Sequence, residues 1–240
     1  MAEIVLLHPW PQDHAFWDPV AQVLRQAGHS VTAPDLPGFG DRAREPGWTM
    51  AGEADRLADE VPQGAVVVGL SMGGYVAQAL VAAHPDRIGM LVLADTRCNA
   101  EDAAARQARQ GTADMLRQDG SAEFIESFVP NVVGPDAPEP VRARLRELAA
   151  RQSPDAMADA MEAMAARADT SGVLRALAVP ALVICGEFDK GAPPALHAEM
   201  AALIPDASLA VIGGAGHMSA AEQPQEFAEL VLARIDSAGV

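Results

Sequence analysis

The chain has 240 residues, enough for one large domain or for a domain that carries an insertion. It contains 33 acidic and 17 basic residues, so its formal net charge is −16. A surface of this charge repels phosphate backbones and anionic lipids, which argues against a nucleic-acid or a membrane partner.

The sequence also argues against disulfides, metal sites and export. Its two cysteines, Cys98 and Cys185, lie too far apart for a disulfide framework or for the spacing of metal ligands. The first ten residues contain no basic segment, and no run of roughly 18 apolar residues follows them. We therefore expect a cytoplasmic protein that uses no metal and no cofactor.

The first part of the chain alternates short apolar runs with longer amphipathic stretches. The apolar runs predict buried strands at 4–7, 29–33, 65–68 and 88–94. The stretches between them predict helices at 73–83 and at 50–60, with Thr49 as the N-cap of the latter. Apolar strands that alternate with helices are typical of a parallel sheet that is covered on both faces.

The pattern changes between residues 97 and 172, where no strand is predicted and Ala, Arg, Glu, Gln and Met dominate. Breaks divide this segment into three to five helices, at 120–121, 134–138 and 153–154. Strands resume at 180–185 and 208–212, and prolines open two further helices at 193–194 and near 224. We therefore predict an α/β core of residues 1–96 and 173–240 and a helical insertion of residues 97–172.

The sharpest motif is the G-x-S-x-G sequence of residues 69–73, which lies between a predicted strand and a predicted helix. In this context the motif forms a nucleophile elbow, a sharp turn that lifts the serine hydroxyl above the sheet. Such a turn brings backbone segments together, so the residues two positions away on each side must be small. Gly69 and Gly73 meet that requirement, and Ser71 is therefore the candidate nucleophile.

A serine hydroxyl needs a base to become a nucleophile, and His217 is the candidate among six histidines. It lies in a glycine-rich loop after the last predicted strand, and a base near the C-terminus fits the chain order Ser, acid, His. His84 precedes a proline at a helix end, where it would close that helix. His29 and His197 are expected at the surface.

The third group must orient the imidazole and stabilise its charged form. Asp189 follows the predicted strand at 180–185 and so lies at the carboxyl end of a parallel sheet, where chemistry gathers. Two further carboxylates remain open as candidates for this role. Glu187 lies on the same loop, and Asp95 follows the strand at 88–94, where its alternative role is to cap the first turn of the insertion.

Acyl transfer also needs donors for the oxyanion that develops. The backbone N–H of Met72, directly after the nucleophile, is one candidate. The other is the backbone N–H of Trp10, in the loop after the first predicted strand. Pro9 and Pro11 have no N–H, which narrows the choice in that loop.

Together these residues resemble the α/β-hydrolase superfamily over nearly the whole chain outside the insertion. His8-Pro9-Trp10 is similar to the family's His-Gly-X oxyanion motif, although Pro9 stands where glycine is usual and makes the loop stiffer. Residues 16–20 resemble the tryptophan-containing helix start, and residues 35–40 are similar to the D-x-P-G-x-G loop. The resemblance implies an α/β-hydrolase fold, with a mostly parallel, doubly wound sheet and with residues 97–172 as a helical cap.

Small single-cap members of this superfamily include carboxylesterases, enol-lactonases, perhydrolases and carbon–carbon bond hydrolases. The resemblance therefore implies a serine hydrolase of the carboxylesterase type, which cleaves small to medium esters through Ser71, His217 and Asp189. Enol-lactonase, perhydrolase and carbon–carbon bond hydrolase remain alternatives on the same triad. A protein of another class, which binds a signalling ligand and retains the triad, is a further alternative.

Two observations bear on the substrate, although no substrate-binding residue is predicted. Met157, Met161 and Met164 share one helix face, which indicates either core packing or an apolar roof over the pocket. The net charge of −16 favours neutral esters over free acids.

Overall fold

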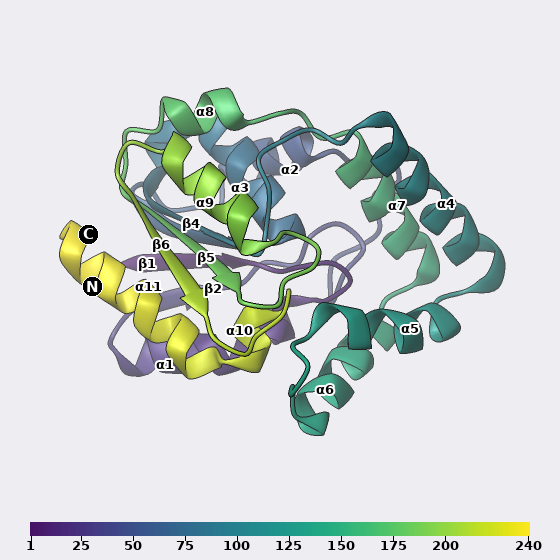
Figure 1. Ribbon diagram of the computed structural model, residues 1–240. Coiled ribbons are helices and arrows are strands. Elements are labelled where there is room, and N and C mark those ends of the chain that lie inside the picture. The colour runs from purple at the N-terminus through teal and green to yellow at the C-terminus, as the bar shows by residue number, and fades with distance from the viewer.

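The computed structural model describes residues 1–240, and its centre is a six-stranded sheet of order β2-β1-β3-β4-β5-β6 (Figure 1). All neighbouring strands are parallel. The strands are β1 (Glu3–Leu7), β2 (Ser30–Thr32), β3 (Ala65–Leu70), β4 (Ile88–Ala94), β5 (Ala181–Gly186) and β6 (Ala207–Ile212). The structure thus confirms the predicted doubly wound α/β fold.

Helices cover both faces of the sheet, as the continuous apolar strands predict. Figure 1 shows α1 (Asp18–Gln26) and α11 (Pro224–Ala238) on one face. The other face carries α2 (Met50–Leu57), α3 (Met72–Ala83) and α9 (Pro194–Leu203). Side chains alternate along β1, where Ile4 and Leu6 join one hydrophobic core and Val5 and Leu7 the other.

Local sequence signals fix several element ends. The Thr49 side chain accepts a hydrogen bond from the backbone N–H of Gly52 at 3.0 Å and so caps α2, as predicted. The helix ends at Leu57 and passes into a turn, earlier than the predicted end at residue 60.

The segment between β4 and β5 contains helices and no strand, and four of its helices gather at one side of the molecule (Figure 1). They are α4 (Ala103–Asp119), α5 (Ala122–Val132), α6 (Glu139–Ala150) and α7 (Pro154–Ala165). The three predicted breaks separate them. The short elements are η1 (His14–Trp17), η2 (Pro85–Arg87), α8 (Ser171–Arg175) and α10 (Ser219–Glu222). None of the helices combines the length and apolarity needed to cross a bilayer.

Candidate active site

Ser71 lies on the sharp turn between β3 and α3, with a backbone φ of 51°. A positive φ is strained for a residue with a Cβ, and such strain concentrates at functional sites. The flanking glycines allow the turn to close. A Cβ at Gly73 would overlap the backbone carbonyl of Leu7 in β1, and one at Gly69 would overlap the backbone of Gly73.

The three residues predicted as a triad lie together in the predicted order. His217 Nε2 is 2.9 Å from the Ser71 hydroxyl oxygen, and His217 Nδ1 is 2.8 Å from Asp189 Oδ2. Because the Asp189 carboxylate only accepts hydrogen bonds, Nδ1 carries the proton and leaves Nε2 free to accept the serine proton. The second oxygen of Asp189 accepts the backbone N–H of Ala192 at 2.8 Å.

Loop-to-loop hydrogen bonds position the two residues that follow β5 and β6. The N–H of Phe188 donates to the carbonyl of Ala215 at 2.8 Å, which ties the Asp189 loop to the His217 loop. The N–H of Gly216 donates to the Glu222 carboxylate at 2.8 Å. Both loops are therefore held at the carboxyl edge of the sheet, where Ser71 projects.

Charge within the triad favours an ionised acid and a basic imidazole. Burial alone would raise the pKa of Asp189, but the charge and hydrogen bond of His217 outweigh it and hold the pKa below its ordinary value. Burial alone would lower the pKa of His217, but the charge and hydrogen bond of Asp189 keep that pKa above its ordinary value. The arrangement stabilises an imidazolium that receives the serine proton.

Both predicted oxyanion donors are free of protein acceptors. Met72 is the first residue of α3, so its N–H has no acceptor within the helix. The N–H of Trp10 makes no hydrogen bond, whereas the N–H of Gln12 in the same loop donates to the carbonyl of Pro9 at 2.9 Å. The helix N-terminus behind Met72 adds a favourable dipole for an anion.

A cavity of about 400 Å³ opens over Ser71 and His217. Its volume falls within the range of small-molecule sites. Helices α4, α5 and α7 form much of its wall, opposite the carboxyl edge of the sheet. Its lining comprises Trp10, Ser71, Tyr75, Arg97, Glu101, Ala105, Ala108, Arg109, Phe128, Asn131, Val132, Met161, Met164, Gly191, Ala192 and His217.

Comparison with known proteins agrees with this geometry. The sequence model of the "Alpha/beta hydrolase family" matches residues 4–230. The chain belongs to the alpha/beta hydrolase family. The resemblance drawn from the motifs is therefore confirmed.

Among the relatives of this hydrolase is a pimeloyl-[acyl-carrier protein] methyl ester esterase of Neisseria meningitidis serogroup B. The two are 30% identical over 236 residues, which cover 95% of this chain and 90% of that protein. Two solved structures are similar: a malate-bound thermophilic esterase from Thermogutta terrifontis and an enol-lactonase from Burkholderia xenovorans LB400. The first is 31% identical with a TM-score of 0.95, and covers 100% of this chain and 91% of its own. The second is 28% identical with a TM-score of 0.87, and covers 98% and 91%.

Two expectations about neighbouring residues of the hydrolase are wrong. Asp95 does not cap the insertion, because Asp102 accepts the N–H of Ala105 and caps α4 instead. Asp95 is fully buried, and its two oxygens accept hydrogen bonds from the backbone N–H of Gly186 and from the hydroxyl of Ser219. It therefore ties the end of β4 to the end of β5 and to the start of α10, which border the loops of Asp189 and His217.

His197 is not a surface residue, although it lies on α9. It is fully buried, and its Nε2 accepts the backbone N–H of Thr96 at 3.1 Å. Its Nδ1 lies 3.3 Å from the carbonyl of Pro193. Since both nitrogens have partners inside the protein, His197 is a structural histidine that ties α9 to the end of β4.

Glu187, His84 and His29 make their hydrogen bonds away from the site. Glu187 is exposed and accepts the N–H of Gly214 at 2.9 Å. His84 Nε2 lies 2.8 Å from the Asp55 carboxylate, and half-buried His29 accepts the N–H of Ala2. None of these three side chains bonds to the residues of the predicted triad.

The methionine face of α7 contributes both to core packing and to the wall of the cavity, the two roles that the sequence left open. Met161 and Met164 line the cavity, whereas Met157 is fully buried in the core. The Trp10 ring joins the two regions, because its Nε1–H donates to the carbonyl of Met157 at 3.1 Å and its ring packs against Phe124 and Phe128.

Sequence reasoning missed the polar residues of the cavity, above all Arg97, Arg109 and Asn131. Arg97 could have been found by the argument that selected Asp189, since it also follows a strand at the carboxyl edge of the sheet. Arg109 and Asn131 lie on α4 and α5. No local signal marks them, because their approach to the site depends on how these helices pack.

Proposed function

We propose that this hydrolase cleaves carboxylic esters of small to medium size through Ser71, His217 and Asp189, by way of an acyl-enzyme. The observation that carries the proposal is the pair of hydrogen bonds made by His217, to Ser71 at 2.9 Å and to Asp189 at 2.8 Å. The similarity to esterases from two organisms supports the same reaction class.

In the acylation step, the Ser71 hydroxyl oxygen attacks the ester carbonyl carbon while His217 Nε2 takes the serine proton. The negative charge that develops on the carbonyl oxygen is held by the backbone N–H groups of Met72 and Trp10. His217 then gives its proton to the leaving alcohol, and the acyl group remains on Ser71. Asp189 stabilises the imidazolium throughout but keeps its own charge.

In the deacylation step, a water molecule takes the place of the alcohol and His217 acts as its base. The hydroxide attacks the acyl carbon, the same two N–H groups hold the oxyanion, and the proton passes back to the Ser71 oxygen. The products are a carboxylic acid and the free enzyme.

Replacement of the nucleophile tests the mechanism. We expect Ser71→Ala to lower kcat on short p-nitrophenyl esters by on the order of 10⁴-fold, because the remaining groups cannot form the acyl-enzyme. Ser237→Ala, at an exposed position on α11, is the matched control and should retain full activity. Wild-type turnover by Ser71→Ala would refute the proposal.

Enol-lactone hydrolysis is a second candidate function, because a protein with this activity has a similar structure at 28% identity. The same residues would open a ring ester and keep both products in one molecule. Turnover of enol-lactones and of simple methyl esters, compared by kcat/KM, separates the two. A single stoichiometric burst on every ester, without repeated turnover, would instead favour a ligand-binding protein with a retained triad.

A further inference from the structure

The charge of the catalytic cavity is opposite in sign to that of the whole chain. Apart from His217, the charged side chains that line it are Arg97, Glu101 and Arg109. Glu101, whose side chain is 6% exposed, binds Arg109 at 2.9 Å and Arg167 at 2.5 Å. The only carboxylate in the cavity wall is therefore already shared by two guanidinium groups.

Arg97 is the cation of the cavity that has no carboxylate partner. Its guanidinium donates a hydrogen bond to the backbone carbonyl of Gly191, on the Asp189 loop, and makes no ion pair. Its positive charge acts on the catalytic base. Burial and, to a smaller extent, the charge of Arg97 lower the pKa of His217, and the charge and hydrogen bond of Asp189 together with the charge of Asp95 outweigh them. An unpaired positive charge thus lies beside the reacting groups.

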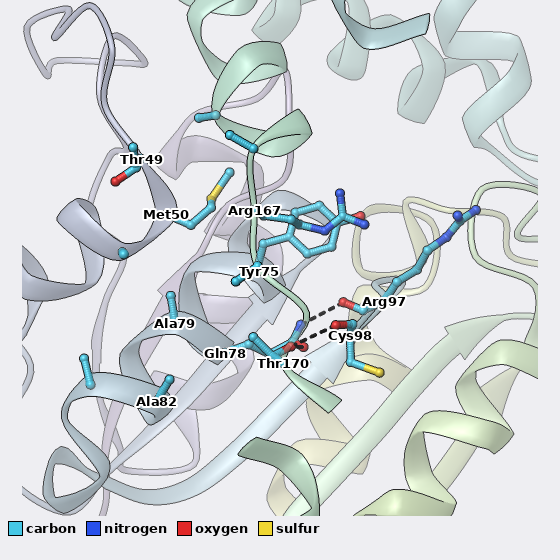
Figure 2. A pocket seen from close by; sticks show the side chains of 15 residues that line it. Thr49, Met50, Tyr75, Gln78, Ala79, Ala82, Arg97, Cys98, Arg167 and Thr170 are labelled. Atoms are coloured by element: carbon cyan, nitrogen blue, oxygen red, sulfur yellow. Dashed lines mark hydrogen bonds between the residues drawn. The ribbon is translucent and has the colours of Figure 1, made fainter. Parts of the chain in front are cut away.

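Figure 2 shows the Arg97 side chain among the residues that line a neighbouring cavity of about 480 Å³. Arg97 and Tyr75 line both cavities. In Figure 2 the Arg97 side chain extends away from Gln78 and Thr170, which hydrogen-bond to each other at 2.6 Å. The hydrogen bond to the Gly191 carbonyl places its guanidinium at the catalytic cavity, which Arg97 and Gly191 both line.

We propose that Arg97 binds a carboxylate carried by the substrate, and that the preferred substrates are half-esters of short dicarboxylic acids. A guanidinium presents paired N–H donors that match the two oxygens of a carboxylate, and a half-buried site strengthens that pairing. The inference rests on the proposed esterase function and narrows it to esters that carry an acid.

The acidic surface of the protein does not prevent a negatively charged ester from binding to Arg97 inside the cavity. The net charge of −16 acts over a distance and slows the encounter with anions, but salt screens it beyond about 8–10 Å. Contact with Arg97 acts inside the cavity, where screening is weak. The overall charge therefore affects the rate of association, while Arg97 determines which bound ester is held.

A matched pair of substrate series tests the proposal. One series consists of monomethyl esters of the straight-chain dicarboxylic acids from succinic to suberic acid. The other consists of methyl esters of monocarboxylic acids with the same numbers of carbons. We expect the wild type to prefer the charged series, and Arg97→Gln to lower kcat/KM for that series by about 10- to 100-fold more than for the uncharged series, mainly through KM. Arg97→Lys should retain part of the preference.

Arg106→Gln is the control, since it removes one positive charge from an exposed position on α4. It should leave both series unchanged. Equal losses on both series in Arg97→Gln, or no preference for the charged series in the wild type, would overturn the role of Arg97 while the esterase function stands. If the wild type hydrolyses neither series, the esterase function falls and this inference falls with it.

Discussion

Asp95 is a buried acid whose surroundings favour its neutral form at neutral pH. Burial and then the charge of Asp189 raise the pKa of Asp95 to about 8. Polar atoms of Asp95, Asp189 and His197 all lie within 4.8 Å of one another, so a second negative charge there would face the first across a dry interior. Asp95 therefore acts as a neutral acid that holds the loops of the other two strands.

We predict that Asp95→Asn stabilises the fold increasingly as the pH rises. An acid whose pKa is raised by folding keeps its proton in the native state and loses it in the unfolded state, so it reduces stability progressively between about pH 4 and pH 8. Asparagine can keep both partners, with Oδ1 accepting from Gly186 and Nδ2 donating to the Ser219 hydroxyl oxygen, and it has no such proton. Melting temperatures of the variant and the wild type, measured from pH 5 to 9, should diverge toward pH 8.

The matching variant is Asp95→Ala, which also lacks the titrating proton but loses both hydrogen bonds, and it should be less stable than Asp95→Asn at every pH. A difference between Asp95→Asn and the wild type that stays constant from pH 5 to pH 8 would mean that the acid does not hold its proton over this range.

At the scale of elements, the turn from β3 to α3 depends on glycine for steric reasons. We predict that Gly73→Ala is destabilised by about 1–3 kcal/mol or more, because its Cβ would overlap the backbone carbonyl of Leu7 rather than a side chain that can move. Gly111→Ala is the control. Nothing lies within 4 Å of a Cβ at Gly111, which is exposed on α4, so alanine should stabilise that helix by up to about 1 kcal/mol. Urea unfolding of both variants checks the contrast, and equal effects would contradict it.

The same elements explain how far the sequence predicts the site. Ser71, Asp189 and His217 follow β3, β5 and β6, and the carboxyl ends of parallel strands must meet at one edge, so local patterns are enough to bring them together. The expectations for His197 and Asp95 fail because burial depends on neighbours from distant segments. No periodicity within α9 reveals that Thr96 donates to His197.

At the scale of the whole molecule, a chain of ion pairs joins the helical segment to the core. Asp159 on α7 binds Arg44, from the loop after β2, and Arg117 on α4. Its side chain is 3% exposed, and those of Arg44 and Arg117 are 36% and 31% exposed. Because α7 also carries Met161, which lines the cavity, this network holds part of the cavity wall in place.

We predict that Asp159→Asn destabilises the protein by about 1–2 kcal/mol at pH 7, less than the loss of a fully buried pair because water reaches both guanidinium groups. Burial alone would raise the pKa of Asp159, but hydrogen bonds from Arg44 and Arg117 outweigh it and hold the pKa below its ordinary value. An acid whose pKa is lowered by folding stabilises the native state above its unfolded pKa, which is near 4. This stabilisation is lost as the pH falls through the lower pKa that the acid has in the folded protein. The difference between variant and wild type should therefore close as the pH falls below about 4.

Glu147→Gln provides the comparison, since the Glu147–Arg151 pair is exposed and its loss should hardly change the stability. Urea unfolding at pH 7 and at pH 3 measures both variants against the wild type. If Asp159→Asn costs no more than Glu147→Gln, or if its cost persists at pH 3, the network does not hold α7 against the core. The position of the cavity wall would then depend on apolar contacts such as the packing of Trp10 against Phe124 and Phe128.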